Sequence, residues 1–193
     1  KGFFPNTKFP RILKVLHFRL HGRFSPRAVR LLAVLCSFSG GLPTGAPTSP
    51  AIANQVLSRA DRSIRKAAET KNVCYTRYAD DLTFSGDGHE PVEILPFVEE
   101  VVGQLGYQLD PKKTNFFRKG RRQCVTGLVV NQKPNLAKPL RRRLRAAVHR
   151  YVHQKPMEWH GRPMNLTQLL GRLGFLAQTQ PEEAKRLKTL IQA

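Results

Sequence analysis

The stretch Tyr75-Thr76-Arg77-Tyr78-Ala79-Asp80-Asp81-Leu82-Thr83-Phe84-Ser85 decides how this chain is organised. Residues 73–78 and 82–85 are two short runs rich in aromatic and β-branched side chains, which favour strands. Only three residues separate the runs, so the pattern predicts a β-hairpin with Asp80 and Asp81 at its tip. Two adjacent carboxylates repel each other unless a cation neutralises them, and Mg²⁺ is the usual partner of such a pair. An ordinary Asp-Asp turn is the alternative interpretation of the dipeptide alone.

A two-metal centre would give this tip a catalytic use. Two metal ions about 3.5–4 Å apart can activate a 3′-hydroxyl group and stabilise a leaving pyrophosphate. Such a centre needs at least one further carboxylate from another strand. The pair Asp80-Asp81 is therefore predicted to be part of a metal site rather than the whole of it.

Upstream of the hairpin, two serine-proline pairs predict helix starts. The pair Ser25-Pro26 precedes a dense apolar run, so we expect a mostly buried helix that runs up to a stop at Gly40-Gly41. The pair Ser49-Pro50 opens a segment whose apolar residues share one helical face, which predicts an amphipathic helix that ends near Glu69.

Downstream, the pattern changes once. We expect a helix over 94–105, strands over 107–109, 115–118 and 124–130, and then helices over 140–153, 166–177 and 181–191. We therefore place a domain boundary near residue 135. The expected fold is α+β, with a mixed domain over residues 1–134 and a helical domain over residues 135–193.

The charge of the chain indicates a polyanionic partner. Its 193 residues include 33 Lys and Arg against 13 Asp and Glu, a net charge of +20, and residues 112–193 hold 19 of the basic but 3 of the acidic side chains. Nucleic acid is the expected partner, contacted by the first helix of the helical domain. A solvated helix face is the alternative interpretation. The predicted phosphate-contacting residues are Arg141, Arg142, Arg143, Arg145 and Arg150.

Other sequence features bear on the location of the protein. The chain has no apolar run of about 18 residues or more, so no membrane-spanning segment is expected. Its three cysteines are odd in number and form no Cys-X-X-Cys pair, which favours a reducing compartment. We expect a soluble, cytoplasmic protein.

Two motifs in this order resemble one family. Residues 75–85 contain Tyr78-Ala79-Asp80-Asp81, which resembles the YxDD signature of reverse transcriptases, and the whole stretch resembles the retron-type version. The segment 41–54, with Leu42-Pro43-Thr44-Gly45-Ala46-Pro47-Thr48-Ser49-Pro50, resembles the family's LPQGAPTSP segment. The resemblance covers nearly the whole chain, since residues 125–131, 170–175 and 181–183 are also similar to the family.

The resemblance implies a function and a set of partners. It implies a nucleotidyltransferase that adds deoxynucleotides to a primer 3′-hydroxyl on an RNA template, with two Mg²⁺ ions bound. A structured noncoding RNA, deoxynucleoside triphosphates, a DNA product and an effector protein in antiviral defence are the implied partners. The implied fold is a right-hand polymerase palm, an antiparallel sheet with helices, followed by a helical thumb; the fingers are expected to lie outside the chain.

The resemblance also implies roles for single residues. Asp80 and Asp81 are implied metal ligands and catalytic residues. A lysine is expected near the triphosphate, and of Lys112 and Lys113 we favour Lys113. Thr44 and Gly45 are implied nucleotide contacts, although Thr44 stands where the family usually has glutamine. Phe4 corresponds to the residue that excludes a 2′-hydroxyl group, with core packing as its alternative role. The first catalytic aspartate of the family is expected two positions before Lys1.

Two other functions remain open at this stage. A noncatalytic RNA-binding module would explain the basic helical domain without a complete metal site. A group II intron-type or phage-defence reverse transcriptase would share the same palm motifs and differ in its RNA.

Overall fold

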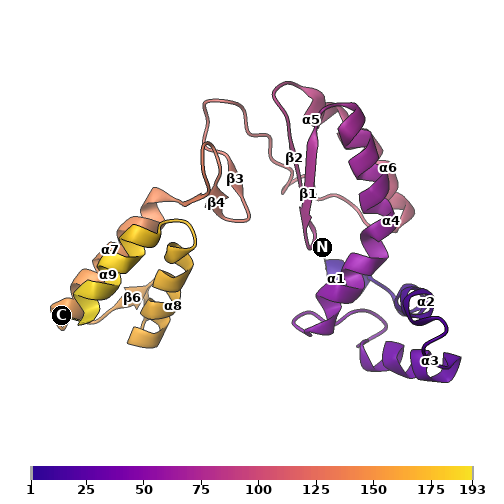
Figure 1. Cartoon of the computed structure of the whole chain (residues 1–193), viewed down its shortest axis with the longest axis horizontal. Helices are drawn as coiled ribbons and strands as arrows, with labels where there is room; N and C mark the ends of the chain where they lie inside the picture. The colour runs from indigo at the N-terminus through magenta and orange to yellow at the C-terminus, as the bar shows by residue number, and fades with distance from the viewer. Residues whose placement is uncertain (1, 193) are drawn as a thin grey trace. The chain divides into compact units, whose positions relative to one another are not determined.

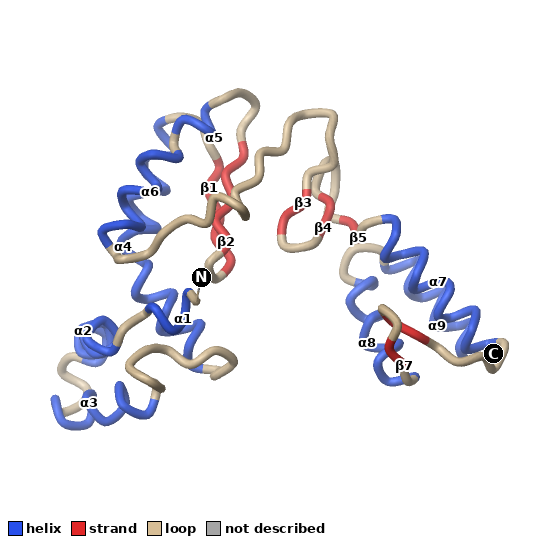
Figure 2. Tube along the Cα trace, turned by 180° about the vertical axis from the view of Figure 1, so that it is seen from behind, coloured by secondary structure: helices blue, strands red, loops and turns tan. Residues whose placement is uncertain are grey.

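One long helix, α4 (Thr48–Thr70), organises the first of the two compact units into which the chain divides. The structure is a computed structural model that describes residues 2–192. The first unit ends at Asn115, and the second begins at Phe116. Both units combine helices with small antiparallel sheets, as expected for an α+β protein (Figures 1 and 2).

The first unit holds six helices and one two-stranded sheet among its described residues. Besides α4, the elements are α1 (Phe3–Asn6), α2 (Phe9–Leu20), α3 (Pro26–Leu35), β1 (Cys74–Tyr78), β2 (Asp81–Ser85), α5 (Glu90–Glu93) and α6 (Leu95–Gln104). The predicted hairpin is confirmed, as is the end of α4 within one residue. The helix α3 ends at Leu35, before the expected stop at Gly40-Gly41. The sequence analysis did not predict α1 or α2.

Two small cores share α4. Near its N-terminus, Ile52, Ala53 and Val56 pack with buried residues of α2 and α3. Near its C-terminus, Ile64 and Ala68 pack with the hairpin and α6. Because a single helix contributes to both cores, the segments that pack on it are held in one frame.

The expectation that α3 is mostly buried is wrong. Val29 and Ala33 are buried, but Leu31 and Leu35 are 59% and 72% exposed. The spacing of these residues explains the difference, because a helix packed on one side buries only the residues that recur every three or four positions. The side chains of Leu31 and Leu35 lie outside that stripe.

Gly41 shows why a glycine stands just after α3. The chain passes so close to Pro5 that a Cβ atom at Gly41 would lie 2.3 Å from the Pro5 carbonyl oxygen. Gly41 also exchanges backbone hydrogen bonds with Phe38. Glycine is therefore required here by close approach of two backbone segments rather than as a helix stop.

The helix α4 begins one residue before the predicted start at Ser49-Pro50. The helix begins at Thr48, so Ser49 lies inside the first turn and does not cap it. Its buried hydroxyl group instead donates a 2.6 Å hydrogen bond to the carbonyl oxygen of Pro43. The serine thus ties the preceding loop to the helix, a role that the cap pattern could not distinguish.

Two of the predicted strands are loops. Residues 107–109 and 115–118 form no ladder with any described strand. Tyr107 and Leu109 are partly buried against the core shared by the hairpin and α6, so packing explains their apolar character. Phe116 is 59% exposed.

The second unit is built around three helices. They are α7 (Lys138–Val152), α8 (Leu166–Ala177) and α9 (Pro181–Gln192), close to the predicted ranges. A three-stranded antiparallel sheet precedes them, with β3 (Cys124–Val125), β4 (Leu128–Val129) and β5 (Asn135–Leu136) in that order. A further hairpin, β6 (Glu158–Trp159) and β7 (Arg162–Pro163), was not predicted. The predicted strand over 124–130 is two strands joined by a turn at Thr126-Gly127.

The boundary between the units lies earlier than the expected one near residue 135. Leu136 of β5 is buried in the same core as Leu144 of α7 and Leu173 of α8, and Leu128 of β4 packs against it. The small sheet therefore belongs with the helices that follow it. Sequence periodicity marked the change to helices but not this packing.

Candidate active site at the β1–β2 turn

The β1–β2 hairpin holds the predicted catalytic pair in a two-residue turn. Its register runs from Cys74 opposite Ser85 to Tyr78 opposite Asp81, so Ala79 and Asp80 form the turn and Asp81 begins β2. Ala79 has a φ angle of 52°, which is uncommon for a residue with a side chain. Both aspartates are exposed. Their carboxylates have no partner among residues 2–192, so they are free to bind a ligand.

The two faces of the hairpin have different tasks. Tyr75 and Arg77 lie two positions apart along β1, so both side chains are on the face that packs toward α4. Their cross-strand partners on that face are Phe84 and Leu82. The rings of Tyr75 and Phe84 stack with their centroids 5.0 Å apart. Asp81 directly precedes Leu82 along β2, and successive side chains of a strand point to opposite faces. Asp81 therefore lies on the face turned away from this packing.

Arg77 is the centre of a hydrogen-bond network between α4 and the turn. Its Nε and Nη2 groups donate to the two carboxylate oxygens of Asp61, at 2.8 and 2.6 Å. Its Nη1 group donates to Oδ1 of Asn54 at 2.9 Å and to the carbonyl oxygen of Ala79 at 2.8 Å. One guanidinium group therefore fastens the residue next to Asp80 to two positions of α4.

The surroundings strengthen this network. The side chains of Arg77 and Asp61 are 9% and 22% exposed, and the Tyr75 hydroxyl also donates to Asp61, at 2.9 Å. The hydrogen bond with Asp61 raises the pKa of Arg77, although burial opposes that effect. Burial raises the pKa of Tyr75, and Asp61 adds to this, so the phenol remains a donor. Asp61 thus accepts three hydrogen bonds, which is strong compensation for a partly buried carboxylate.

The loop before α4 carries the predicted nucleotide contacts. Thr44 and Gly45 are exposed, and Gly45 has a φ angle of 90°, a conformation that glycine adopts without strain. The hydrogen bond from Ser49 to Pro43 holds this loop on the first turn of α4. The loop and the β1–β2 turn are therefore attached to the same helix.

Phe4 is partly buried and packs against the core formed by α2 and the N-terminal half of α4. Its ring centroid lies 5.1 Å from that of Phe3, whose ring contacts Tyr107 at 5.5 Å. Figures 1 and 2 draw the β1–β2 turn at the end of the unit where α1 lies. The core-packing role of Phe4 is thus observed; a role beside a nucleotide stays a prediction.

Lys113 lies in a turn at residues 110–114, where its backbone amide donates to the Asp110 carbonyl oxygen at 2.9 Å. Its side chain is exposed and has no partner among residues 2–192.

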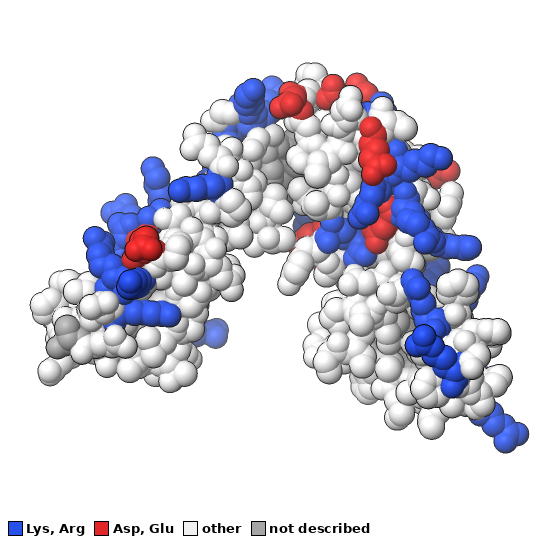
Figure 3. Space-filling view, in the orientation of Figure 1, with Lys and Arg blue, Asp and Glu red and all other residues white. Residues whose placement is uncertain are grey.

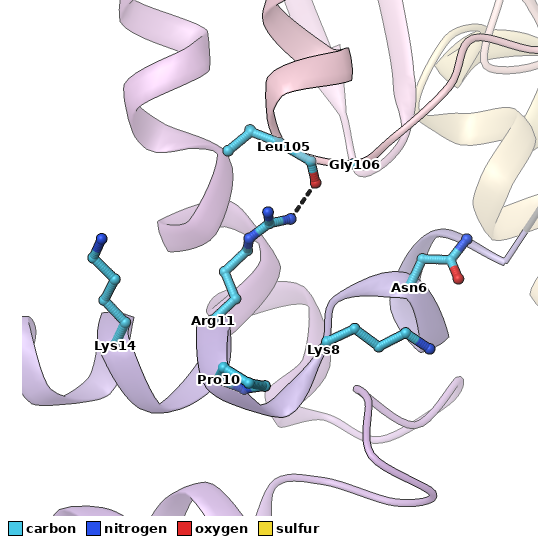
Figure 4. Close-up of a pocket in the computed structure, with 7 residues that line it drawn as sticks. All are labelled: Asn6, Lys8, Pro10, Arg11, Lys14, Leu105 and Gly106. Atoms are coloured by element: carbon cyan, nitrogen blue, oxygen red, sulfur yellow. Dashed lines mark hydrogen bonds between the residues drawn. The ribbon is translucent and has the colours of Figure 1, made fainter.

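A hollow of about 480 Å³ in this unit lies elsewhere, between α2 and the end of α6 (Figure 4). There Arg11 donates to the Leu105 carbonyl oxygen. None of the predicted site residues lines it.

A metal ion fits the chemistry of the turn but needs more ligands than the turn supplies. Asp80 and Asp81 offer hard carboxylate oxygens that no described cation neutralises. Within residues 2–192, no three His, Cys, Asp or Glu side chains cluster in a way that could hold a metal. Among residues 2–192, Asp80 and Asp81 are therefore candidate ligands that do not complete a metal site by themselves.

The predicted phosphate-contacting arginines are on α7, and several have internal partners. Arg141 and Arg145 both donate to Glu183 of α9, the latter through Nε at 2.7 Å. Burial alone raises the pKa of Glu183, but the hydrogen bonds from Arg145 and Arg141 outweigh it and lower the pKa. These two arginines join α7 to α9, a structural use that composition could not reveal.

The other three arginines of the set are exposed. Arg143 lies 3.1 Å from the His160 ring nitrogens, and Arg150 donates to the Pro156 carbonyl oxygen at 3.1 Å. No partner of Arg142 is found in the described chain. On the face of this unit that Figure 3 shows, Lys and Arg clearly outnumber Asp and Glu.

Comparison with known proteins agrees with this arrangement. Residues 34–163, which include the loop before α4 and the β1–β2 turn, match the family described as reverse transcriptase (RNA-dependent DNA polymerase). The chain belongs to the reverse transcriptase family. The curated proteins to which it is similar include retron reverse transcriptases.

Three of these relatives show the extent of the similarity. The chain is 35% identical to the Retron Mx65 reverse transcriptase of Myxococcus xanthus over 97% of its own length and 46% of the relative's. It is 36% identical to the Retron Mx162 enzyme of the same organism, over 96% and 44%. For the Retron Ec86 enzyme of Escherichia coli the identity is 29%, over 99% and 57%. The chain thus spans about half the length of the relatives it matches.

The residues that support the turn are not among the predicted site residues. Arg77, Asp61 and Asn54 are absent from the predicted site, yet they make the contacts that hold it. A signal was present, because Arg77 stands at an inward position between Tyr75 and the turn, where a charged side chain needs a buried partner. The sequence could not identify Asp61 as that partner without the spatial arrangement of α4.

Proposed function

We propose that the protein carrying this chain is an RNA-directed DNA polymerase that adds deoxynucleotides to the 3′-hydroxyl of a primer on an RNA template. The observation that carries the proposal is the β1–β2 turn, where Asp80 and Asp81 are exposed and unpaired while Arg77 fastens the turn to α4. Family membership supports it. A catalytic pair must be accessible to substrate and still held rigidly, and this arrangement meets both needs.

The roles proposed for single residues are those that the family resemblance implies. Asp80 and Asp81 would hold Mg²⁺ together with a further carboxylate that the β1–β2 turn does not supply. The bound metal would stabilise the charge on the attacking hydroxyl and on the leaving pyrophosphate. Gly45 and Thr44 would lie along the nucleotide on the loop that Ser49 ties to α4. Phe4 would limit space at the sugar, and Lys113 would neutralise charge on the triphosphate.

The two units would take the two parts of a right-hand polymerase. We assign the palm to the first unit and the thumb to the second, with the sheet of β3, β4 and β5 joined to the thumb rather than to the palm as expected from a boundary at 134/135. Residues 116–193 hold 17 basic and 3 acidic side chains, which suits a grip on phosphates. A structured noncoding RNA would be the template and primer partner, with a DNA product and deoxynucleoside triphosphates.

The setting of the enzyme is part of the proposal. The described chain has no helix of the length and apolar character that crossing a membrane requires. We propose that it acts in the cytoplasm, with an effector protein in antiviral defence as the further partner. A group II intron-type or phage-defence enzyme would share the palm, and DNA linked covalently to RNA in cells would favour the retron type.

A noncatalytic RNA-binding module is the second candidate function. The specific observation in its favour is the excess of basic side chains in residues 116–193, which would bind RNA without any metal. The two functions differ in their dependence on the turn. RNA binding by such a module would not involve Asp80.

Primer extension by an Asp80→Asn variant tests the proposal. We expect the variant to lose extension of a primer on an RNA template while its affinity for RNA stays within about twofold, because the turn holds metal rather than phosphate. Asp87→Asn, an exposed aspartate beyond β2, is the matched control and should extend normally. Each protein should be assayed as the 193-residue chain and together with any segment that its gene encodes before Lys1. Extension by Asp80→Asn at the wild-type rate would refute the assignment.

A further inference from the structure

The second unit contains a pocket that the proposed polymerase function does not use. It has a volume of about 380 Å³ and lies between α7 and α8, beside the β6–β7 hairpin. Leu140 and Leu144 line it from α7, and Trp159 from β6, while Gln168, Arg172 and Phe175 line it from α8. It includes part of the segment 170–175, which resembles the family and to which no role was assigned.

Arg172 has an unusual environment in this pocket. Its guanidinium carbon lies 4.1 Å from the centroid of the Trp159 ring, so the two groups stack. This stack is the only interaction found for Arg172 among residues 2–192, and its Nε group is shielded from solvent without an acceptor. Both carboxylate oxygens of Glu183 are already occupied by Arg141 and Arg145. The guanidinium lies over the indole ring, and its N–H groups have no acceptor among residues 2–192.

The other lining groups indicate what could accept those donors. Gln168 uses its amide oxygen to accept from the Asn165 backbone in the cap of α8, and its amide nitrogen has no partner in the described chain. Phe175 is 45% exposed, and Leu144 is 1% exposed. The pocket therefore offers an aromatic ring and an apolar wall, with hydrogen-bond donors and no free acceptor at Arg172.

We propose that this pocket binds an unpaired nucleobase of RNA, with its carbonyl groups toward Arg172 and Gln168. A nucleobase is flat, stacks on aromatic and guanidinium groups, and presents in-plane acceptors, which together match the lining. The 17 basic and 3 acidic side chains of residues 116–193 favour a phosphate-bearing ligand over an apolar side chain of another protein. We take uracil as the base, because its two carbonyl oxygens would accept from the Arg172 guanidinium and the Gln168 amide group.

The assignment reaches beyond polymerisation and does not depend on the metal site. It gives the second unit a preference for single-stranded RNA over duplex RNA, because a paired base cannot enter a pocket. Phosphate contacts alone would bind both forms. An experiment without nucleotide addition therefore separates the two ideas.

Trp159 makes the test direct, because it is the only tryptophan of the chain. We would titrate the full chain with oligouridine of about ten nucleotides, and with a duplex RNA of equal length, at about 0.15 M salt. Tryptophan fluorescence and RNA anisotropy would be followed together. We expect saturable quenching by oligouridine and little quenching by the duplex.

Two variants and a control decide the outcome. Gly171 lines the pocket and a Cβ atom there meets nothing within 4 Å, so Gly171→Leu should fold and fill the pocket. We expect Gly171→Leu and Arg172→Gln to lose about fivefold or more in affinity for oligouridine, the scale of one stacked base, and to bind duplex as before. Arg186→Gln, an exposed arginine on α9, removes the same charge as Arg172→Gln and should change binding less than about twofold.

Either of two results would overturn the proposal. One is oligouridine binding by Gly171→Leu with wild-type affinity and quenching, which would leave the pocket to an apolar side chain of a protein partner. The other is an equal loss on oligouridine and duplex, which would reduce Arg172 to a phosphate contact. Loss of primer extension in an Asp80 variant would leave both measurements unchanged.

Discussion

Replacing Arg77 by methionine should damage the β1–β2 turn more than any other single change to its support. Methionine keeps the apolar stem but removes four hydrogen bonds, two to Asp61 and one each to Asn54 and the Ala79 carbonyl oxygen. Asp61 then keeps Tyr75 as its remaining donor. Breaking a buried ion pair costs about 3–5 kcal/mol, and the 22% exposure of Asp61 lets water recover part of it. We expect a loss of about 2–3 kcal/mol in the free energy of unfolding.

The same variant should slow catalysis through the position of Asp80. Without the hydrogen bond to its carbonyl oxygen, Ala79 is free to leave its strained conformation, and the neighbouring carboxylates move with it. A misplacement of about 1 Å can cost about 10²-fold in rate, so we expect kcat to fall about 10- to 100-fold. The KM for the deoxynucleotide should change less than about threefold, because Arg77 contacts no substrate.

Urea denaturation followed by circular dichroism, and steady-state primer extension at a temperature where each variant is folded, measure the two effects. Arg77→Lys should recover part of both, because lysine can reach Asp61 but cannot form the two-point contact. Lys71→Met is the matched control, since the Lys71–Glu93 pair is exposed to solvent and contributes little to stability. If Arg77→Met is no more harmful than Lys71→Met, the positioning role is wrong.

Three further predictions concern single groups. The pKa of Glu183 is lowered in the folded state, so its contribution to stability is full above its ordinary pKa, about 4.3, and is lost as the pH falls through the folded-state value. The free energy of unfolding should therefore fall less steeply with acidification for Glu183→Gln than for wild type. Gly41→Ala should lose about 2 kcal/mol or more in thermal unfolding because its Cβ atom meets the Pro5 backbone, whereas Gly103→Ala, with open space on a helix, should gain about 0.5–1 kcal/mol. Ala79→Gly should stabilise the turn by about 0.5–1 kcal/mol, since glycine accepts the positive φ angle, and a loss of stability would contradict that strain.

Periodic elements of this fold could be predicted from sequence, and elements defined by contact could not. The range of α8 was predicted without error because Asn165 caps it and its apolar residues recur at helical spacing. Residues 107–109 were taken for a strand because an apolar run looks alike in a strand and in a packed loop. Only the three-dimensional contacts of Tyr107 with Phe3 and Thr7 distinguish the two.

The candidate site divides in the same way. Asp80 and Asp81 were found because adjacent residues in a hairpin tip form a local pattern. Asp61 and Asn54 were missed because they lie 16 and 23 residues from Arg77 along the chain, and their contacts depend on how α4 crosses the hairpin. Likewise, Arg141 and Arg145 were assigned to RNA because charge counts cannot show that Glu183 lies between them.

The central claim is that Asp80 and Asp81 hold divalent cations against a nucleotide, and metal binding measures it most directly. Mn²⁺ can stand in for Mg²⁺, and electron paramagnetic resonance counts the free ion in the presence of a deoxynucleoside triphosphate. We predict that the chain lowers free Mn²⁺ below the level set by the nucleotide alone, that Asp87→Asn does the same, and that a variant with Asp80→Asn and Asp81→Asn does not. Equal Mn²⁺ binding by that double variant and the wild type would contradict the account.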